Sequence, residues 1–214
     1  MVFDGWPEEA LEFYEGLEAD NTRTYWMAHL EIYETKVRGP MTELLDELGA
    51  GFGPTKIFRP YRDVRFSKDK SPYKTAIAAT VGDGYVHLSA QGLAAGNGMY
   101  AMAPDQLERY RRAVASDLAG EQLERVISSV RGHGIDVRGH ETLKTAPRGY
   151  PPDHERIELL RCKGLIAWQE WPVEAWLGTA GAKQRVAGFL TATQPLADWL
   201  AAQVGSSAVA ARRS

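Results

Sequence analysis

"KTAIAATVGDGYVHLSAQGLAAGNGMYAM", residues 74–102, contains three short runs rich in β-branched and aromatic residues, separated by glycine-containing turns. The runs cover 74–81, 84–90 and 92–102, and the turns between them read GDG and QG. Runs of this length joined by such turns predict antiparallel β-hairpins. A fourth run, "KIFRPYRDVRF" (56–66), precedes them and predicts another strand. The middle of the chain therefore predicts a mainly antiparallel sheet.

Helical periodicity precedes this sheet. Pro7 and the acids that follow it begin an amphipathic pattern over 7–19, and apolar residues continue at helical spacing over 25–37 and 41–48. We expect the dipeptide at 20–21 to end the first helix and cap the second. We expect Gly39-Pro40 to separate the second helix from the third.

The second half of the chain alternates between the two periods. Helices are predicted over 104–118, 120–134, 154–161 and from 172 onward, with an interruption at Pro195. Strands are predicted over 134–139 and 164–171. The fold class is therefore α+β, with a central mainly antiparallel sheet and N-terminal, middle and C-terminal helices packed on it. We expect a single domain over 1–204 and a flexible C-terminal tail over 205–214.

Composition is that of a globular protein. With 44% hydrophobic and 25% charged residues, the 214-residue chain can bury a sizeable core. It contains no apolar run long enough to span a bilayer, and its first residues lack the basic and apolar segments of a signal peptide. The single Cys162 cannot form an internal disulfide, which agrees with a reducing compartment. We therefore expect a cytoplasmic protein without a bound metal or cofactor.

Positive charge is concentrated in one stretch. The formal net charge is −3, but residues 56–74 carry a balance of +5, which leaves −8 for the rest of the chain. The cations are Lys56, Arg59, Arg62, Arg65, Lys68, Lys70 and Lys74, set against Asp63 and Asp69. If 57–66 is extended, Arg62 shares a face with Phe58, Val64 and Phe66, while Arg59, Tyr61, Asp63 and Arg65 point the other way.

The segment "SKDKSPYK" (67–74) has the composition of a loop, because its serines and aspartate favour turns and Pro72 disfavours a helix. A basic loop that emerges from a basic strand is suited to hold a phosphate or carboxylate. We therefore predict binding of a small anionic ligand. The candidate contacts in this stretch are Arg59, Arg62, Arg65, Ser67, Lys68, Lys70, Tyr73 and Lys74.

Other functions stay open. An enzyme acting on a phosphorylated or nucleotide substrate would need a proton carrier, and Asp63 and His87 are the candidates. Aromatic residues interleaved with the cations are also typical of single-strand nucleic-acid binders, although the acidic remainder opposes a long polyanion. A third alternative is a docking surface for an acidic protein. The five histidines show no metal-binding spacing, so no metal ligands are predicted.

Four segments together resemble a known family. They are "DNTRTYW" (20–26), "FRPYRDVRFSKDKSPYKT" (58–75), "GHETLKTAPRGYPPDH" (139–154) and "ELLRCKGL" (158–165). The chain resembles, over roughly 3–202, the conserved hypothetical family called domain of unknown function 2461. It departs from the family pattern mildly, at Asp20 and Tyr150. The resemblance implies no activity, but it adds Lys144 to the candidate ligand contacts, with Arg148 and Lys163 as further cations in these segments.

Overall fold

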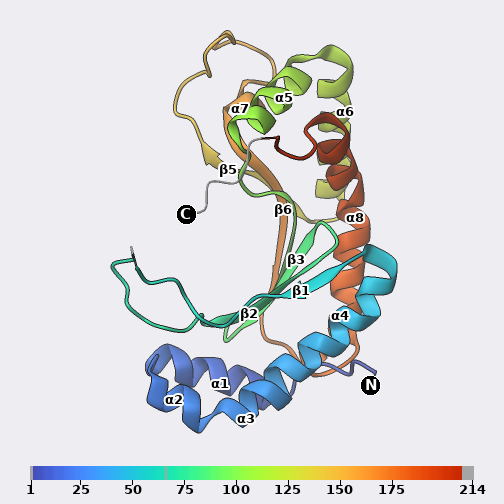
Figure 1. Ribbon diagram of the computed structural model, residues 1–214. Coiled ribbons are helices and arrows are strands. Elements are labelled where there is room, and N and C mark those ends of the chain that lie inside the picture. Colours follow the sequence, from blue (N-terminus) through green and yellow to red (C-terminus); the bar gives the residue numbers. More distant parts are fainter. Residues whose placement is uncertain (1, 66, 209–214) are drawn as a thin grey trace. The chain divides into compact units, whose positions relative to one another are not determined.

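Six strands form one sheet in the computed structural model, which describes residues 2–65 and 67–208 (Figure 1). The strands are β1 Thr55–Ile57, β2 Ala76–Val81, β3 Gly84–Ser89, β4 Gly92–Met99, β5 Asp136–Thr142 and β6 Cys162–Trp171. Their order across the sheet is β1-β2-β3-β4-β6-β5, and β1–β2, β2–β3 and β5–β6 pair antiparallel. The predicted α+β fold is confirmed.

Helices precede, interrupt and follow the strands. They are α1 Glu8–Ala19, α2 Arg23–Ala28, α3 Leu30–Ile32, the π-helix η1 Tyr33–Arg38, α4 Gly39–Phe52, α5 Pro104–Ala115, α6 Asp117–Gly132, α7 Ile157–Arg161, the 3₁₀-helix η2 Ala175–Gly178 and α8 Gly181–Gln203. In the part of the chain that the structure describes, each helix is too short or too polar to cross a membrane.

The chain is divided into two compact units, each assembled from two segments. The first unit comprises the chain up to Ala95 together with Glu170–Leu190. The second comprises Gly96–Gln169 and the chain from Thr191 onward. Strands β4 and β6 and helix α8 contribute residues to both units. The expectation of one domain over 1–204 stays a prediction.

The hairpin β2–β3 is the regular centre of the first unit. Val81 pairs with Gly84, so the turn consists of Gly82 and Asp83. Gly82 has φ 55°, and a Cβ there would lie 2.0 Å from the carbonyl oxygen of Phe52. A type II′ turn places glycine at this first central position. The GDG signal therefore predicted the turn correctly.

The two faces of this hairpin have different environments. One face is buried in the core and consists of Ile77, Ala79, Val81, Val86 and Leu88. Helix α4 contacts β1 and β2 and buries its own apolar side through Met41, Leu44, Leu45 and Leu48. The other face carries Tyr85 and His87, which stay partly exposed opposite Thr80 and Ala78. The titratable side chains of these two paired strands therefore lie on the second face.

One predicted helix boundary in the first unit is wrong, and another is right in position only. The N-cap of α2 is Thr22, whose hydroxyl accepts a hydrogen bond from the Tyr25 amide at 3.2 Å, and not the dipeptide before it. A new helix does begin at Gly39-Pro40, but the chain stays helical across this boundary, because η1 leads directly into α4 and Gly39 has φ −53° and ψ −61°. Proline suits the first turn of a helix, where its missing amide hydrogen is not needed.

Helices α5, α6 and α7 form the second unit with β5, the adjoining part of β6 and the end of α8. The Tyr110 hydroxyl donates to the Leu159 carbonyl at 3.1 Å, and the Trp199 indole donates to the Ala119 carbonyl at 3.1 Å. The interruption predicted at Pro195 is wrong, because α8 continues through it. Burial of the residues that follow, including Trp199, outweighs the local preference of proline.

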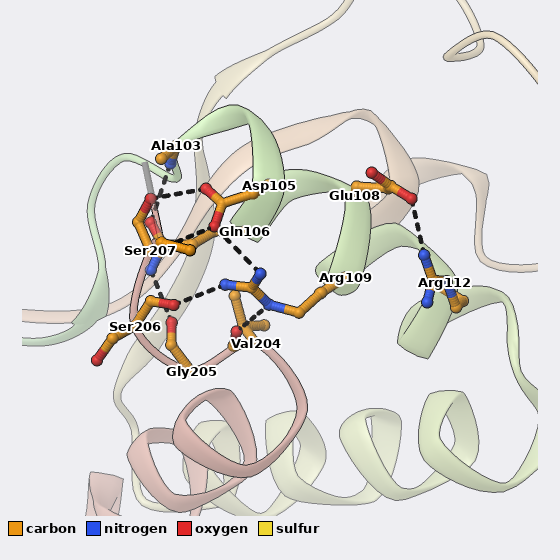
Figure 2. Close-up of polar contacts among 11 residues, drawn as sticks. Ala103, Asp105, Gln106, Glu108, Arg109, Arg112, Val204, Gly205, Ser206 and Ser207 are labelled. Atoms are coloured by element: carbon orange, nitrogen blue, oxygen red, sulfur yellow. Dashed lines mark hydrogen bonds and ion pairs between the residues drawn. The ribbon is translucent and has the colours of Figure 1, made fainter. Parts of the chain in front are cut away.

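Residues 205–208, where we expected a flexible tail to begin, contact the N-terminal half of α5 (Figure 2). Asp105 accepts hydrogen bonds from the Ser207 hydroxyl at 2.7 Å and from the Ala208 amide at 2.9 Å. Arg109 donates to the Ser206 carbonyl at 2.8 Å and pairs with Asp105 at 3.1 Å. The rest of the expected tail, 209–214, lies outside the described residues.

Candidate anion-binding site

The basic stretch forms a long arm between β1 and β2. We define the arm as residues 58–75, of which Phe66 lies outside the described residues. The predicted strand over 56–66 is wrong, since regular pairing is confined to Thr55–Ile57. Beyond it, Tyr61 forms an isolated antiparallel bridge with Tyr73. Ile57 pairs with Ala79. Between that pair and the Tyr61–Tyr73 bridge, the returning side of the arm contains two more residues than the outgoing side, and this mismatch breaks the ladder.

Side chains along the outgoing half of the arm still alternate. Arg59, Tyr61, Asp63 and Arg65 are exposed, whereas Phe58, Pro60, Arg62 and Val64 are partly buried. Two backbone hydrogen bonds keep this half extended, from Arg62 to the Pro72 carbonyl at 2.9 Å and from Lys74 to the Pro60 carbonyl at 2.8 Å. Exposed and partly buried side chains therefore alternate along this half of the arm as expected from the sequence.

Both aspartates of the arm pair with arginines of the arm. The Arg65 guanidinium donates to both carboxylate oxygens of Asp63, with the shortest contacts from Nε at 3.0 Å and from Nη2 at 2.6 Å. This pairing lowers the pKa of Asp63 to about 2. Asp69 accepts from the Ser71 hydroxyl at 2.6 Å and pairs with Arg62, and these contacts hold its pKa well below its usual range. Two arginines are thus neutralised within the arm.

The remaining five cations of 56–74 have no carboxylate partner among the described residues. The Lys70 ammonium donates to the Val64 carbonyl at 2.9 Å, and that of Lys74 lies 5.6 Å from the centre of the Phe58 ring. For the others, Lys56, Arg59 and Lys68, the described part of the chain provides neither a hydrogen bond nor an ion pair. The local charge of +5 therefore stays uncompensated.

A residue from the N-terminal helices anchors the arm. The Asn21 side chain accepts a hydrogen bond from the Tyr73 amide at 3.0 Å and donates to the Tyr73 carbonyl at 3.1 Å. Trp26 stacks on the Tyr73 ring with 4.3 Å between centroids and an interplanar angle of 4°. Trp26 is a buried core residue, as expected, but Asn21 was interpreted only as a helix cap.

The arm and the N-terminal helices enclose a cleft of about 370 Å³, which we call the arm cleft. Trp26 and Leu30 contribute from α2 and α3, and the π-helix η1 contributes three residues of its own. The full lining is Trp26, Leu30, Tyr33, Glu34, Arg38, Ile57, Phe58, Arg59, Pro60 and Tyr61. π-helical turns are rare and recur at functional sites. The arm cleft is therefore a concave site at the basic stretch and a candidate binding site.

The polar groups of the arm cleft differ in how they are held. Arg38 pairs with Glu34 at 2.9 Å. Burial, with Glu34 nearby, raises the pKa of Tyr33 to about 12, so its hydroxyl stays protonated. Arg59 is the lining cation that makes no hydrogen bond or ion pair within the described residues, although it attracts the Asp63 carboxylate at longer range.

A second cleft of about 440 Å³ lies on the same unit, and we call it the strand cleft. Its lining is His87, Ser89, Gln91, Gly92, Leu93, Ala94, Glu170, Trp171 and Pro172. Burial lowers the pKa of His87, and the negative charge of Glu170 acts in the opposite direction. His87 and Arg59 line different clefts, so the structure does not join them in one pocket.

The cations of the later segments belong to the second unit. Lys144 and Arg148 are exposed in the connection between β5 and α7. Lys163 pairs with Glu141 at 3.0 Å, and Glu141 has the left-handed φ of 48°. Within the described residues, no group of three histidine, cysteine or acidic side chains is arranged to hold a metal.

Residues 9–199 match the family model described as Conserved hypothetical protein (DUF2461). The chain belongs to this family. The match extends over segments of both compact units and includes the arm and its anchor Asn21. None of the curated proteins compared with the chain matches it.

Proposed function

We propose that this member of the family binds a small anionic ligand, bearing a phosphate or a carboxylate, in the arm cleft. Arg59 carries the proposal: its guanidinium lines a concave site and makes no hydrogen bond or ion pair among the described residues, with only a longer-range attraction to the Asp63 carboxylate. Guanidinium groups bind phosphate and carboxylate through two parallel hydrogen bonds. A structural arginine would be expected to pair with an acid, as Arg62 and Arg65 do.

The surrounding charge supports the same proposal. Lys68, Lys70 and Lys74 lie on the arm without a carboxylate partner among the described residues, so their charges add to that of Arg59. A local positive field raises the concentration of anions near the cleft and speeds their association. We assign these lysines to attraction and Arg59 to direct contact.

The other candidate residues have supporting roles in this proposal. Arg62 and Arg65 are occupied by the aspartates of the arm, and Tyr73 is the point at which the arm is anchored. Ser67, next to the undescribed Phe66, is partly buried on the arm. Lys144 belongs to the second unit, and its contact with a ligand stays a prediction, as does the cytoplasmic location.

Calorimetric titration with inorganic pyrophosphate and with citrate at low salt tests the proposal. Arg59→Ala should weaken binding about tenfold or more, because a hydrogen bond to a charged group contributes about 1.5–3 kcal/mol. Arg125→Ala is the matched control, since Arg125 is an exposed cation of α6 in the second unit. The proposal fails if neither anion binds, or if the Arg59 and Arg125 variants bind equally well.

An enzyme is the second candidate, and the strand cleft favours it. His87 lines a cleft in which burial favours the neutral imidazole, and a neutral imidazole can accept a proton near pH 7. Glu170 lines the same cleft and is the kind of group that orients a catalytic histidine. Asp63 is unsuited to this role, because its ion pair with Arg65 makes it a weak base.

A further inference from the structure

Aromatic rings make up much of the arm cleft. Trp26, Tyr33, Phe58 and Tyr61 all line it. Trp26 lies 4.7 Å from Tyr33 and 6.2 Å from Tyr61, measured between ring centroids. An inorganic anion needs cations and amide hydrogens but gains nothing from rings. The lining is therefore richer in aromatic surface than the binding of a bare phosphate requires.

Most of these rings already have partners that explain them. One face of Trp26 is covered by Tyr73, and Trp26 is only 3% exposed. Tyr33 is buried as well, and Phe58 lies beneath the Lys74 ammonium. These three rings therefore have packing partners within the protein whether or not a ligand binds.

Tyr61 differs because 51% of it is exposed, although it lies on the rim of a cleft. Its ring is held 5.5 Å from the Tyr73 ring, and its backbone is fixed by the bridge to Tyr73. An ordered aromatic ring that keeps a free surface is the feature on which flat ligands stack.

Arg59 and Tyr61 both line the arm cleft. They lie on either side of Pro60, where the backbone bends, and both side chains are exposed. Two residues so close in the chain have Cα atoms at most about 7 Å apart, the spacing of a fully extended chain. A guanidinium and a ring within this distance match a molecule that carries its anionic group one sugar-length from a planar ring.

We propose that the ligand of the arm cleft joins a planar aromatic ring to a phosphate, which is the chemistry of a mononucleotide. Its ring stacks on Tyr61 and its phosphate pairs with Arg59. This inference rests on the proposed anion site and adds to it the class of ligand. A free nucleotide and the end of a single nucleic-acid strand share this chemistry, and the experiment below separates the two.

Calorimetry with four probes tests the inference: adenosine 5′-monophosphate, ribose 5-phosphate, adenosine and a short single-stranded oligothymidylate. The mononucleotide should bind about tenfold more tightly than ribose 5-phosphate, as expected for one base stacked on a ring. Tyr61→Leu should abolish that preference and leave binding of ribose 5-phosphate unchanged. Tyr61→Phe should retain it. Tyr100→Leu, which removes an exposed ring of the second unit, is the control and should have no effect.

The possible outcomes separate the anion site from the class of ligand inferred for it. If ribose 5-phosphate and the mononucleotide bind equally and both depend on Arg59, the anion site stands and the aromatic ligand is ruled out. If no phosphate binds, the mononucleotide is ruled out, and the anion site falls with it unless citrate binds. If adenosine alone binds as tightly as the mononucleotide, the pairing of ring and phosphate is wrong. Tighter binding of the oligothymidylate, with a steep loss of affinity in salt, would identify a single strand as the source of the ligand.

Discussion

At the scale of single residues, His87 provides a test that needs no ligand. Burial lowers the pKa of its imidazole, and the Glu170 carboxylate partly offsets that effect. Glu170→Gln removes the negative charge, so the titration midpoint of His87 should move to lower pH. Two-dimensional NMR of the imidazole resonances measures both midpoints. A midpoint that rises or stays constant in the variant would contradict the assigned electrostatics of the strand cleft.

Local spacing accounts for some side-chain partners but not for others. Asp63 and Arg65 are two residues apart in an extended segment, so their pairing follows from alternation alone. Asn21 and Tyr73 are separated by 52 residues, and nothing in either local pattern indicates that they meet. The family resemblance placed both residues in its segments without saying why. The charge count therefore indicated a candidate site, whereas the contact that anchors the arm became visible only in the three-dimensional structure.

At the scale of elements, the Asn21 side-chain amide and the stacked ring of Trp26 hold the arm at Tyr73. Asn21→Ala removes both hydrogen bonds to the Tyr73 backbone and should loosen the arm without unfolding the sheet. Amide hydrogen exchange should then speed up at Tyr73 and Arg62 and stay unchanged in β3. Anion affinity should fall as well, because the arm cleft loses its fixed wall.

Gln91→Ala is the control for this experiment. The Gln91 side chain donates a hydrogen bond to Glu18 at 3.1 Å, so it also joins the N-terminal helices to a turn of the sheet, but its bond is not made to a residue of the arm. Its replacement should leave exchange in the arm unchanged. Equal protection of the arm in the Asn21 variant and the wild type would show that the stacking of Trp26 on Tyr73 suffices to hold it.

Sequence patterns predicted elements well where local and tertiary preferences agree. The β2–β3 hairpin is such a case, because a glycine turn, period-2 alternation and burial all favour it. The arm is the opposite case. Its residues alternate like a strand, but Pro60 provides no amide hydrogen and the return path is two residues longer, so regular pairing stops after Ile57. Alternation in the sequence predicts which face a side chain lies on. Whether the segment pairs as a strand depends on the length and sequence of the segment opposite it.

At the scale of the whole molecule, each compact unit needs a distant segment of the chain to complete it. The second unit includes the chain from Thr191 onward. Ser207, which donates a hydrogen bond to Asp105, lies in this part of the chain, after the end of α8. Folding of this unit therefore joins positions about a hundred residues apart. Such contacts form late if loop closure must precede them.

The last prediction concerns the stability of this closure. Contacts with Ser207 and the Ala208 amide, aided by Arg109, lower the pKa of Asp105 to about 2 from its ordinary value near 3.8. A carboxylate whose folded pKa is lowered stabilises the fold above its unfolded pKa, and that contribution is lost as the pH falls through the folded value. Asp105→Asn should therefore lower the melting temperature by a few degrees at pH 7. The difference from the wild type should shrink between about pH 4 and pH 2.

Asp136→Asn, which changes an exposed acid of β5, is the control and should have little effect. A destabilisation by Asp105→Asn that persists unchanged at pH 2 would show that the charge of Asp105 is not what holds the C-terminal residues on α5.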